Sequence, residues 1–212
     1  SQAAWVEARK KSSWADFEPW LKRTFELKRQ VANCYGYRDH PYDALIDDYE
    51  PHETTAGAAA VLQGLRDELI RLVQKVAGSP KRAPKLAGPF AVASQEAFGT
   101  LVARSMGFDF DAGRLDVSVH PFCSGLAPGD TRITTRYREG DLSDALYGVL
   151  HEVGHGLYEQ GLPKAEHPGL PLGDSVSLGI HESQSRLWEN LVGRSRSFWR
   201  HFAPVAREHF PA

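Results

Sequence analysis

The sequence predicts a mainly α-helical protein with a small β-sheet beside a metal-binding helix. Three observations predict this fold class. Several long segments place apolar residues at helical spacing, two short segments in the middle of the chain alternate apolar and polar residues, and a helical segment carries an H-E-x-x-H motif at residues 151–155. With 212 residues, the chain can bury the core of one domain or at most two.

Three segments before residue 107 have the spacing of helices. The first covers residues 16–33 and has Pro19 in its first turn, where proline is tolerated. The clearest amphipathic pattern covers residues 55–78, and its apolar stripe predicts a buried face formed by Val61, Leu65, Leu69, Leu72 and Val76. A shorter helix covers residues 94–106 and ends at Gly107. Further along, the alternation at residues 114–119 and 131–137 predicts two strands.

The next helix begins near Asp141 or Ser143, either of which can cap it, and ends at Gly161, before Pro163. Its apolar stripe consists of Leu146, Leu150, Val153 and Leu157. At 100° per residue, His151 and His155 lie on roughly the opposite side of this helix. A helix with leucines on one side and histidines on the other is expected to pack on a core and line a site.

The H-E-x-x-H motif predicts a divalent metal site. Residues four apart share a helix face, so His151 and His155 can reach one ion while Glu152 projects beside it. Neutral imidazole binds Zn²⁺ well, and a catalytic zinc site takes three protein ligands and a water. Glu152 would be the general base that removes a proton from this water.

Glu182 is the best candidate for the third metal ligand. It lies in a segment that is expected to form a helix from near Asp174 or Ser175 to Gly193, with apolar residues Ile180, Leu187 and Leu191 toward the core. Spacing alone leaves other candidates open, namely Glu159, His167, Asp174, His181 and Glu189. His181 is adjacent to Glu182 and so points elsewhere, which suits a contact with another metal ligand or with the substrate better than binding to the same metal.

The motifs together resemble those of the thermostable carboxypeptidase (carboxypeptidase Taq) family of zinc metallocarboxypeptidases. Residues 151–155 and His181-Glu-Ser-Gln-Ser185 match first, followed by His120-Pro-Phe122 and by Asp130-Thr-Arg-Ile-Thr134, which is similar to the family's D-x-R-x-T motif. Residues 42–51 are also family-like. These segments stand in the family's order between about residues 35 and 195.

The resemblance implies a zincin-like helical metallopeptidase core in which His151, His155 and Glu182 bind the metal and Glu152 is the catalytic base. It implies hydrolysis of C-terminal residues from peptides and a possible homodimer. Zinc is the expected metal and cobalt a possible one, because both suit the same ligands. We expect a single domain that is a fragment of a longer metallocarboxypeptidase, with a helical scaffold at residues 1–110 and an active-site core at residues 111–195.

Three residues are candidates for substrate binding, namely His120, Arg132 and His181. An exopeptidase must recognise a free carboxylate, which a guanidinium such as that of Arg132 or Arg136 can bind with two hydrogen bonds. His120 could donate a hydrogen bond to the substrate or to the developing oxyanion. We also expect an edge strand beside the metal helix to pair with an extended peptide.

Composition narrows the choice of partners and compartment. The chain has 25 basic and 27 acidic residues, a formal net charge of −2 and no apolar run of transmembrane length, which argues against nucleic-acid or membrane partners. Two cysteines far apart in sequence, Cys34 and Cys123, suit the cytoplasm. Two alternative functions stay open: a zinc endopeptidase or other zinc hydrolase, and a catalytically silent fragment or interaction module that retains the metal site.

Overall fold

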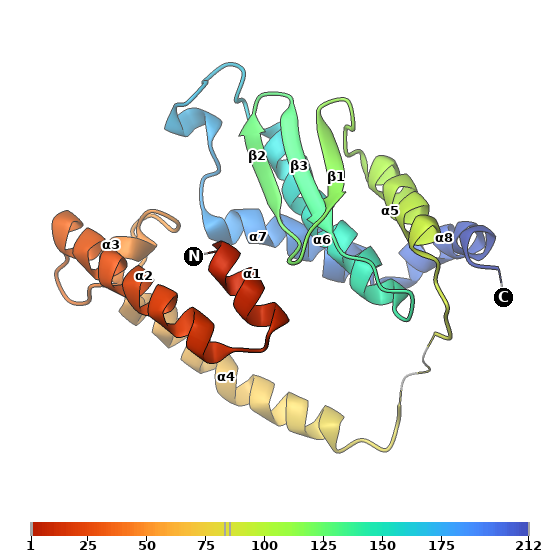
Figure 1. The fold of residues 1–212 in the computed structure, drawn as a ribbon, viewed down its shortest axis with the longest axis horizontal. Helices are drawn as coiled ribbons and strands as arrows, with labels where there is room; N and C mark the ends of the chain where they lie inside the picture. Colours follow the sequence, from red (N-terminus) through yellow and green to blue (C-terminus); the bar gives the residue numbers. More distant parts are fainter. Residues whose placement is uncertain (1, 83, 85, 212) are drawn as a thin grey trace. The chain divides into compact units, whose positions relative to one another are not determined.

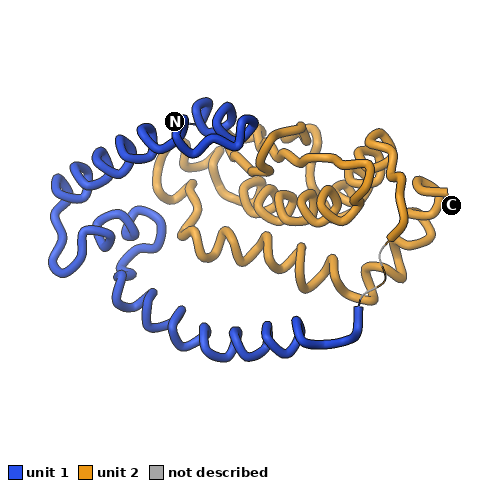
Figure 2. Tube along the Cα trace, turned by 60° about the horizontal axis from the view of Figure 1, so that its bottom comes forward, with its two compact units in different colours: residues 1–83 blue, residues 84–212 orange. Residues whose placement is uncertain are grey.

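The computed structural model describes residues 2–82, 84 and 86–211. The chain divides into two compact units, residues 1–83 and 84–212, and each is described by itself (Figure 2). The first unit is helical, and the second combines helices with one sheet of three strands (Figure 1). The predicted class, mainly α with a small sheet, is confirmed.

The first unit contains helices α1 (Gln2–Lys10), α2 (Trp14–Tyr35), α3 (Asp43–Ile46) and α4 (Thr55–Ala77). Helix α2 begins two residues earlier than the sequence predicts, because the Ser13 hydroxyl caps it by accepting a hydrogen bond from the Asp16 N–H. Pro19 therefore lies inside the helix rather than in its first turn. Helix α4 has the predicted bounds, with Thr54 accepting from the Gly57 N–H at its start and Gly78 at its end.

The apolar stripe of α4 is exposed, which contradicts the expectation that it would face a core. The exposed fractions of its five side chains run from 48% at Leu69 to 71% at Val61. Among the described residues of the first unit, α1 packs on α2 and α2 on α3, but no helix packs along α4. Amphipathic spacing identifies the face that is suited to burial, but it contains no information on what covers that face.

The second unit contains α5 (Val92–Met106), β1 (Gly113–Val117), β2 (Cys123–Ala127), β3 (Asp130–Thr135), α6 (Leu142–Gly161), α7 (Leu178–Arg186) and α8 (Arg196–His209). A short 3-10 turn, Pro171–Gly173, precedes α7, and a π-helical segment, Leu187–Val192, follows it. Helix α6 packs against β3 and β2 on one side, and α5 and α7 also contact it (Figure 1). This helix is therefore central to the second unit.

The sheet has the order β1-β3-β2, so β3 is the central strand, and β1 and β2 are the outer strands. It pairs in parallel with β1 and antiparallel with β2. Strand β2 was not predicted because it alternates little in polarity, but Pro128 and Gly129 close a tight hairpin between it and β3. Gly129 has a φ of 75°, the left-handed conformation that glycine adopts at such turns. Strand β2 is an outer strand and lies beside α6.

Two apolar clusters hold α6 in place. The first joins α5, α6 and α8 through Phe98, Val102, Leu146, Leu150, Phe198 and Phe202. The second joins α5, α6 and the sheet through Ala103, Phe108, Ile133, Val149 and Val153. Each fully buried Leu, Val or Phe contributes about 1.5 to 3 kcal/mol relative to an exposed one. No helix within the described residues is both long and apolar enough to span a lipid bilayer.

Candidate metal centre

Helix α6 presents His151 and His155 from its middle. The Asp141 carboxylate caps the helix by accepting hydrogen bonds from the N–H groups of Ser143 and Asp144. Leu150 and Val153 are fully buried, whereas both histidines are only partly buried. The predicted division of the helix into a core side and a histidine side is therefore confirmed.

Helix α7 approaches α6 at Gly154. A Cβ atom at this glycine would lie 2.7 Å from the Gln184 carbonyl oxygen and from the Ser185 Cα, so a larger residue would push the two backbones apart. Ser185, which is completely buried, is the α7 residue at this contact. Glycine therefore permits the close packing that brings α7 beside the histidines.

The expectation that Ile180, Leu187 and Leu191 face the core is wrong. All three are exposed, and the helix begins after Ser177, whose hydroxyl caps it, rather than near residue 174. The side of α7 that packs on α6 carries the small residue Ser185, because only a small side chain fits where the two backbones are so close. An apolar stripe is therefore a poor guide to orientation here.

Glu182 extends from α7 toward the two histidines. Its Oε2 lies 3.2 Å from His155 Nε2 and 3.6 Å from His151 Nε2. One ligand atom from each of the three residues lies within 4.8 Å of the others, the only such group of three among the described residues. Donors about 2 Å from a tetrahedral zinc ion stand about 3.3 Å apart, so this spacing fits a zinc ion.

The electrostatics of these three side chains suit a cation. Burial, together with the neighbouring His181 and His151, lowers the pKa of His155 to about 4, so its imidazole is neutral at pH 7. Although burial opposes ionisation, the Ser185 hydrogen bond and the nearby His151 lower the pKa of Glu182. A neutral imidazole and a carboxylate that face each other are both electron-pair donors, which is the chemistry that a divalent metal requires.

Glu152 is buried next to this group. Its side chain is 5% exposed, and no group in the described part of the chain forms a hydrogen bond with its Oε2. Burial and the nearby Glu182 and Glu189 raise the pKa of Glu152 to about 8. An unpaired buried carboxyl oxygen is costly, and it is typical of a site that is completed by a water, an ion or a substrate.

Glu189 orients the first histidine. The π-helical segment after α7 closes with a hydrogen bond from the Gly193 N–H to the Trp188 carbonyl, and it places the Glu189 Oε2 2.9 Å from His151 Nδ1. Arg186 connects Glu182 with Glu189, since its Nε donates to Glu182 Oε1 at 2.8 Å and its Nη1 donates to Glu189 Oε2 at 3.1 Å. Glu189, one of the alternative ligand candidates, thus lies behind a histidine and not among the three grouped donors.

His181 and Glu159 lie behind the second histidine. His181 Nδ1 is 2.6 Å from His155 Nδ1, and its Nε2 is 2.7 Å from Glu159 Oε1, so both ring nitrogens are engaged. The two other ligand candidates, His167 and Asp174, are not part of the grouped donors. Sequence reasoning considered Glu159 and Glu189 only as ligands. Glu159 lies four residues after His155, and Glu189 lies seven residues after Glu182. Each therefore shares a helix face with a predicted ligand, and this spacing was the signal for their supporting positions.

A cavity of about 440 Å³ opens against His151 and Glu152. His120 and Arg136 also line it. The His120 Nδ1 is 2.7 Å from the Pro121 carbonyl oxygen, and the Arg136 guanidinium makes two hydrogen bonds of 3.0 Å to Asp144. The structure therefore brings His120 to the same cavity as the H-E-x-x-H helix, together with an arginine that is already paired.

Arg132 does not line this cavity. It projects from the side of β3 opposite the buried Ile133, and its guanidinium forms two hydrogen bonds of 2.9 Å with Asp130. On one side of β3, the D-x-R-x-T segment thus presents Arg132 at the surface, paired with Asp130 of the same segment. On the other side, this strand packs on α6.

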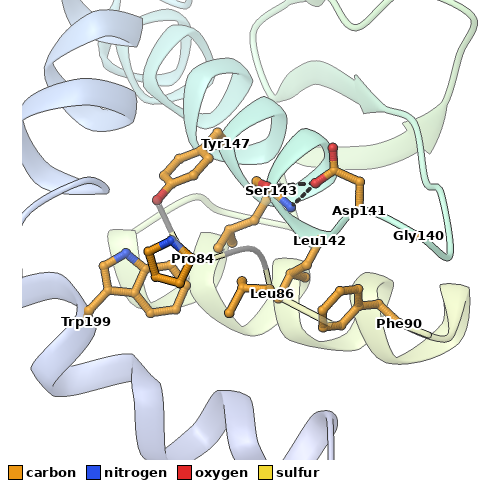
Figure 3. A pocket seen from close by; sticks show the side chains of 10 residues that line it. Pro84, Leu86, Phe90, Gly140, Asp141, Leu142, Ser143, Tyr147 and Trp199 are labelled. Carbon is orange, nitrogen blue, oxygen red and sulfur yellow. Dashed lines mark hydrogen bonds between the residues drawn. The ribbon is translucent and has the colours of Figure 1, made fainter. Parts of the chain in front are cut away.

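A second cavity, of about 500 Å³, lies at the N-terminal end of α6 (Figure 3). Leu86, Phe90, Tyr147 and Trp199 give it an apolar wall. Its one carboxylate, that of Asp141, is occupied by capping the helix, as the dashed lines in Figure 3 show for Ser143. His151, His155 and Glu182 are absent from the described lining of this cavity.

The chain is similar to known carboxypeptidases in sequence and in structure. The chain is 45% identical over 221 residues to thermostable carboxypeptidase 1 of Thermus thermophilus, covering 99% of this chain and 43% of the relative. It is 38% identical over 213 residues to carboxypeptidase 1 of Bacillus subtilis, covering 100% of this chain and 42% of the relative. A crystal structure of an M32 carboxypeptidase from Deinococcus radiodurans R1 matches with a TM-score of 0.85 and 44% identity, covering 99% of this chain and 42% of that one.

The chain thus spans about two fifths of the length of these relatives. Residues 1–212 match the family described as carboxypeptidase Taq (M32) metallopeptidase. This match covers His151, His155 and Glu182 as well as the helical scaffold. The chain belongs to the carboxypeptidase Taq (M32) family of metallopeptidases.

Proposed function

We propose that this chain contains the catalytic metal centre of a metal-dependent carboxypeptidase. His151, His155 and Glu182 hold one divalent metal, zinc or alternatively cobalt, and Glu152 is the general base. The observation that carries the proposal is the approach of three ligand atoms to within 4.8 Å beside the unpaired, buried Oε2 of Glu152. The metallopeptidase family independently implies a divalent metal.

When bound at such a site, a zinc ion acts as a Lewis acid and lowers the pKa of water from 15.7 to about 7. The side chains of this chain supply the remaining functions. A divalent cation beside Glu152 favours the ionised form of its buried carboxyl, and in that form Glu152 accepts a proton from the attacking water and later delivers it to the leaving amine. Glu189 and Arg186 hold His151 and Glu182 in the orientation that directs His151 Nε2 and Glu182 Oε2 toward each other.

The substrate that we propose is a peptide with a free C-terminus. Strand β2, an outer strand beside α6, offers an edge to which an extended peptide can add. His120 lines the cavity next to Glu152, which supports a role for it in donating a hydrogen bond to the peptide. The preference for a free carboxylate is supported by the carboxypeptidase relatives rather than by a free arginine, because Arg136 is paired with Asp144.

A reducing compartment such as the cytoplasm suits the two free cysteines, Cys34 and Cys123. A homodimer stays a prediction, which sedimentation of the purified chain would test.

The test is the release of free amino acid from an N-blocked dipeptide by the 212-residue chain, with and without added Zn²⁺ or Co²⁺. We expect metal-dependent release from the free dipeptide and none from its C-terminally amidated form. Glu152→Gln should abolish release and keep the metal, whereas Glu166→Gln, a matched change at an exposed glutamate, should alter neither. Equal cleavage of the amidated peptide would indicate an endopeptidase, and metal binding without release would indicate a silent fragment.

A further inference from the structure

The two histidines of the H-E-x-x-H helix have different outer partners. His151 Nδ1 makes a direct hydrogen bond of 2.9 Å to the Glu189 carboxylate. His155 Nδ1 instead lies 2.6 Å from a second imidazole nitrogen, Nδ1 of His181. A carboxylate can only accept, so it fixes the tautomer of its histidine, whereas an imidazole nitrogen can either donate or accept. The orientation of the His155–His181 hydrogen bond therefore depends on what lies beyond His181.

Beyond His181 lies a partly buried ion pair. His181 Nε2 is 2.7 Å from Glu159 Oε1, and Glu159 Oε2 is paired with the Lys164 ammonium group. The side chains of His155, His181, Glu159 and Lys164 are between 12% and 16% exposed. Burial removes competing water, so these hydrogen bonds have few alternative partners.

The chain of hydrogen bonds has one direction. Because the Glu159 carboxylate is an acceptor, His181 Nε2 carries the hydrogen and donates it. A neutral imidazole has a single N–H, so His181 Nδ1 is left as an acceptor. His155 Nδ1 must then donate to it, which leaves the lone pair of His155 on Nε2, the atom that lies 3.2 Å from Glu182 Oε2.

We propose that Glu159, acting through His181, selects the His155 tautomer whose Nε2 is free to bind metal, and that Lys164 is the positioning residue for Glu159. This inference rests on the proposed metal centre. It assigns His181 a positioning role rather than a contact with substrate, since both of its ring nitrogens are engaged within the protein.

Lys164 also connects this series of hydrogen bonds to β2, an outer strand of the sheet. Its ammonium donates to the Gly125 carbonyl oxygen of β2 at 3.2 Å. A Cβ atom at Gly125 would overlap both the Glu159 carboxylate and the Lys164 ammonium, so this glycine permits the strand to pass directly over the ion pair. Lys164 thus contacts β2, the strand that we propose as the peptide-binding edge. Through Glu159 and His181, it also supports His155.

The direct test is the tautomer of His155 in the metal-free, 15N-histidine-labelled chain, read from two-bond 1H–15N correlations. We expect the Nδ1–H tautomer in the wild type. His181→Ala removes the acceptor, so the His155 ring should redistribute toward the Nε2–H form. Zinc affinity, measured by competition with a chelator, should fall by about 10- to 100-fold, the usual cost of losing an outer partner of a metal ligand. His201→Ala, at an exposed histidine of α8, is the matched control and should change neither quantity.

Two further variants separate positioning from a general effect on folding. Glu159→Gln keeps the shape of the side chain but can present either an oxygen or an NH₂ group to His181, so a mixture of His155 tautomers is expected. Lys164→Met should weaken zinc binding, and Lys164→Arg, which retains a cation, should restore most of it. If His181→Ala does not fold, as judged by its amide spectrum, the Glu159 and Lys164 variants provide the test.

An unchanged His155 tautomer together with unchanged zinc affinity in His181→Ala and Glu159→Gln would overturn the inference. A wild-type chain that binds no zinc would instead overturn the proposed metal centre. Even then, the tautomer of the metal-free chain and its response to the variants decide whether Glu159 and His181 control His155.

Discussion

Replacing Gly154 by alanine tests whether the close contact of α6 with α7 positions Glu182 beside His151 and His155. Alanine is favoured over glycine within a helix by about 1 kcal/mol, so the substitution would stabilise an unobstructed helix. At Gly154 the new Cβ would lie 2.7 Å from the α7 backbone, whereas ordinary contact begins at 3.4 Å. Helix α7 must therefore shift by about 0.7 Å, the difference between these two distances.

This shift has two measurable consequences. Overpacking of this kind costs about 1 to 3 kcal/mol, so we expect a net loss of up to about 2 kcal/mol in the free energy of unfolding after the gain in helix propensity. Metal–ligand distances tolerate a deviation of only about 0.2 Å, so moving Glu182 with α7 should reduce zinc affinity at least about tenfold. Denaturant unfolding and chelator competition measure the two effects.

The matched control is Gly64→Ala in α4, where nothing lies within 4 Å of the added Cβ. This variant should be more stable than the wild type by about 0.5 to 1 kcal/mol and should bind zinc normally. If Gly154→Ala behaved like Gly64→Ala in both measurements, the packing of α7 on α6 would not be what positions Glu182, and the reasoning would be refuted.

Three further predictions concern a buried leucine, an ion pair and the two cysteines. Leu150→Ala, at a fully buried position of α6, should lower the free energy of unfolding by about 2 to 5 kcal/mol, and a smaller loss in denaturant unfolding would show that the cluster around it is loosely packed. The hydrogen bond from Arg136 lowers the pKa of Asp144. Because its folded-state pKa is depressed, Asp144 stabilises the fold above its unfolded-state pKa of about 3.9 and loses this effect as the pH falls through the folded-state value. Asp144→Asn should therefore be less stable than the wild type by about 1 kcal/mol at pH 7, and the difference should vanish in acid; a difference independent of pH would contradict the ion pair. Burial raises the pKa of Cys123 to about 12, so a thiol reagent at pH 8 should label exposed Cys34 in the native chain and Cys123 only after unfolding, whereas rapid labelling of both would contradict the burial.

The histidine helix was predictable from the sequence because its determinants are local. The cap at Asp141, the apolar stripe through Leu150 and Val153, and the opposite placement of the two histidines all follow from helical periodicity. The approach of Glu182 to His151 and His155 was harder to predict from the sequence. It depends on Gly154 admitting the α7 backbone, a contact between two segments whose own periodicity contains no information on their mutual position.

The features that sequence reasoning missed are tertiary. The apolar stripe of α4 predicts burial, yet it is exposed, because amphipathic spacing cannot supply a partner for the face that it defines. Strand β2 has little alternation and is specified mainly by its hairpin to β3. The pairing of Lys164 with Glu159 depends on a loop that folds back on α6, and no spacing rule predicts that a loop lysine will pair with a glutamate of this helix.

The most direct test of the account is the zinc content and zinc affinity of the dialysed chain, compared with Glu182→Ala and with Glu166→Ala at an exposed glutamate. We predict one zinc per chain in the wild type and in Glu166→Ala, and a loss of affinity in Glu182→Ala that exceeds the about 10- to 100-fold cost of losing an outer partner. A wild-type chain without zinc, or equal retention by Glu182→Ala, would contradict the proposal that His151, His155 and Glu182 together hold the metal.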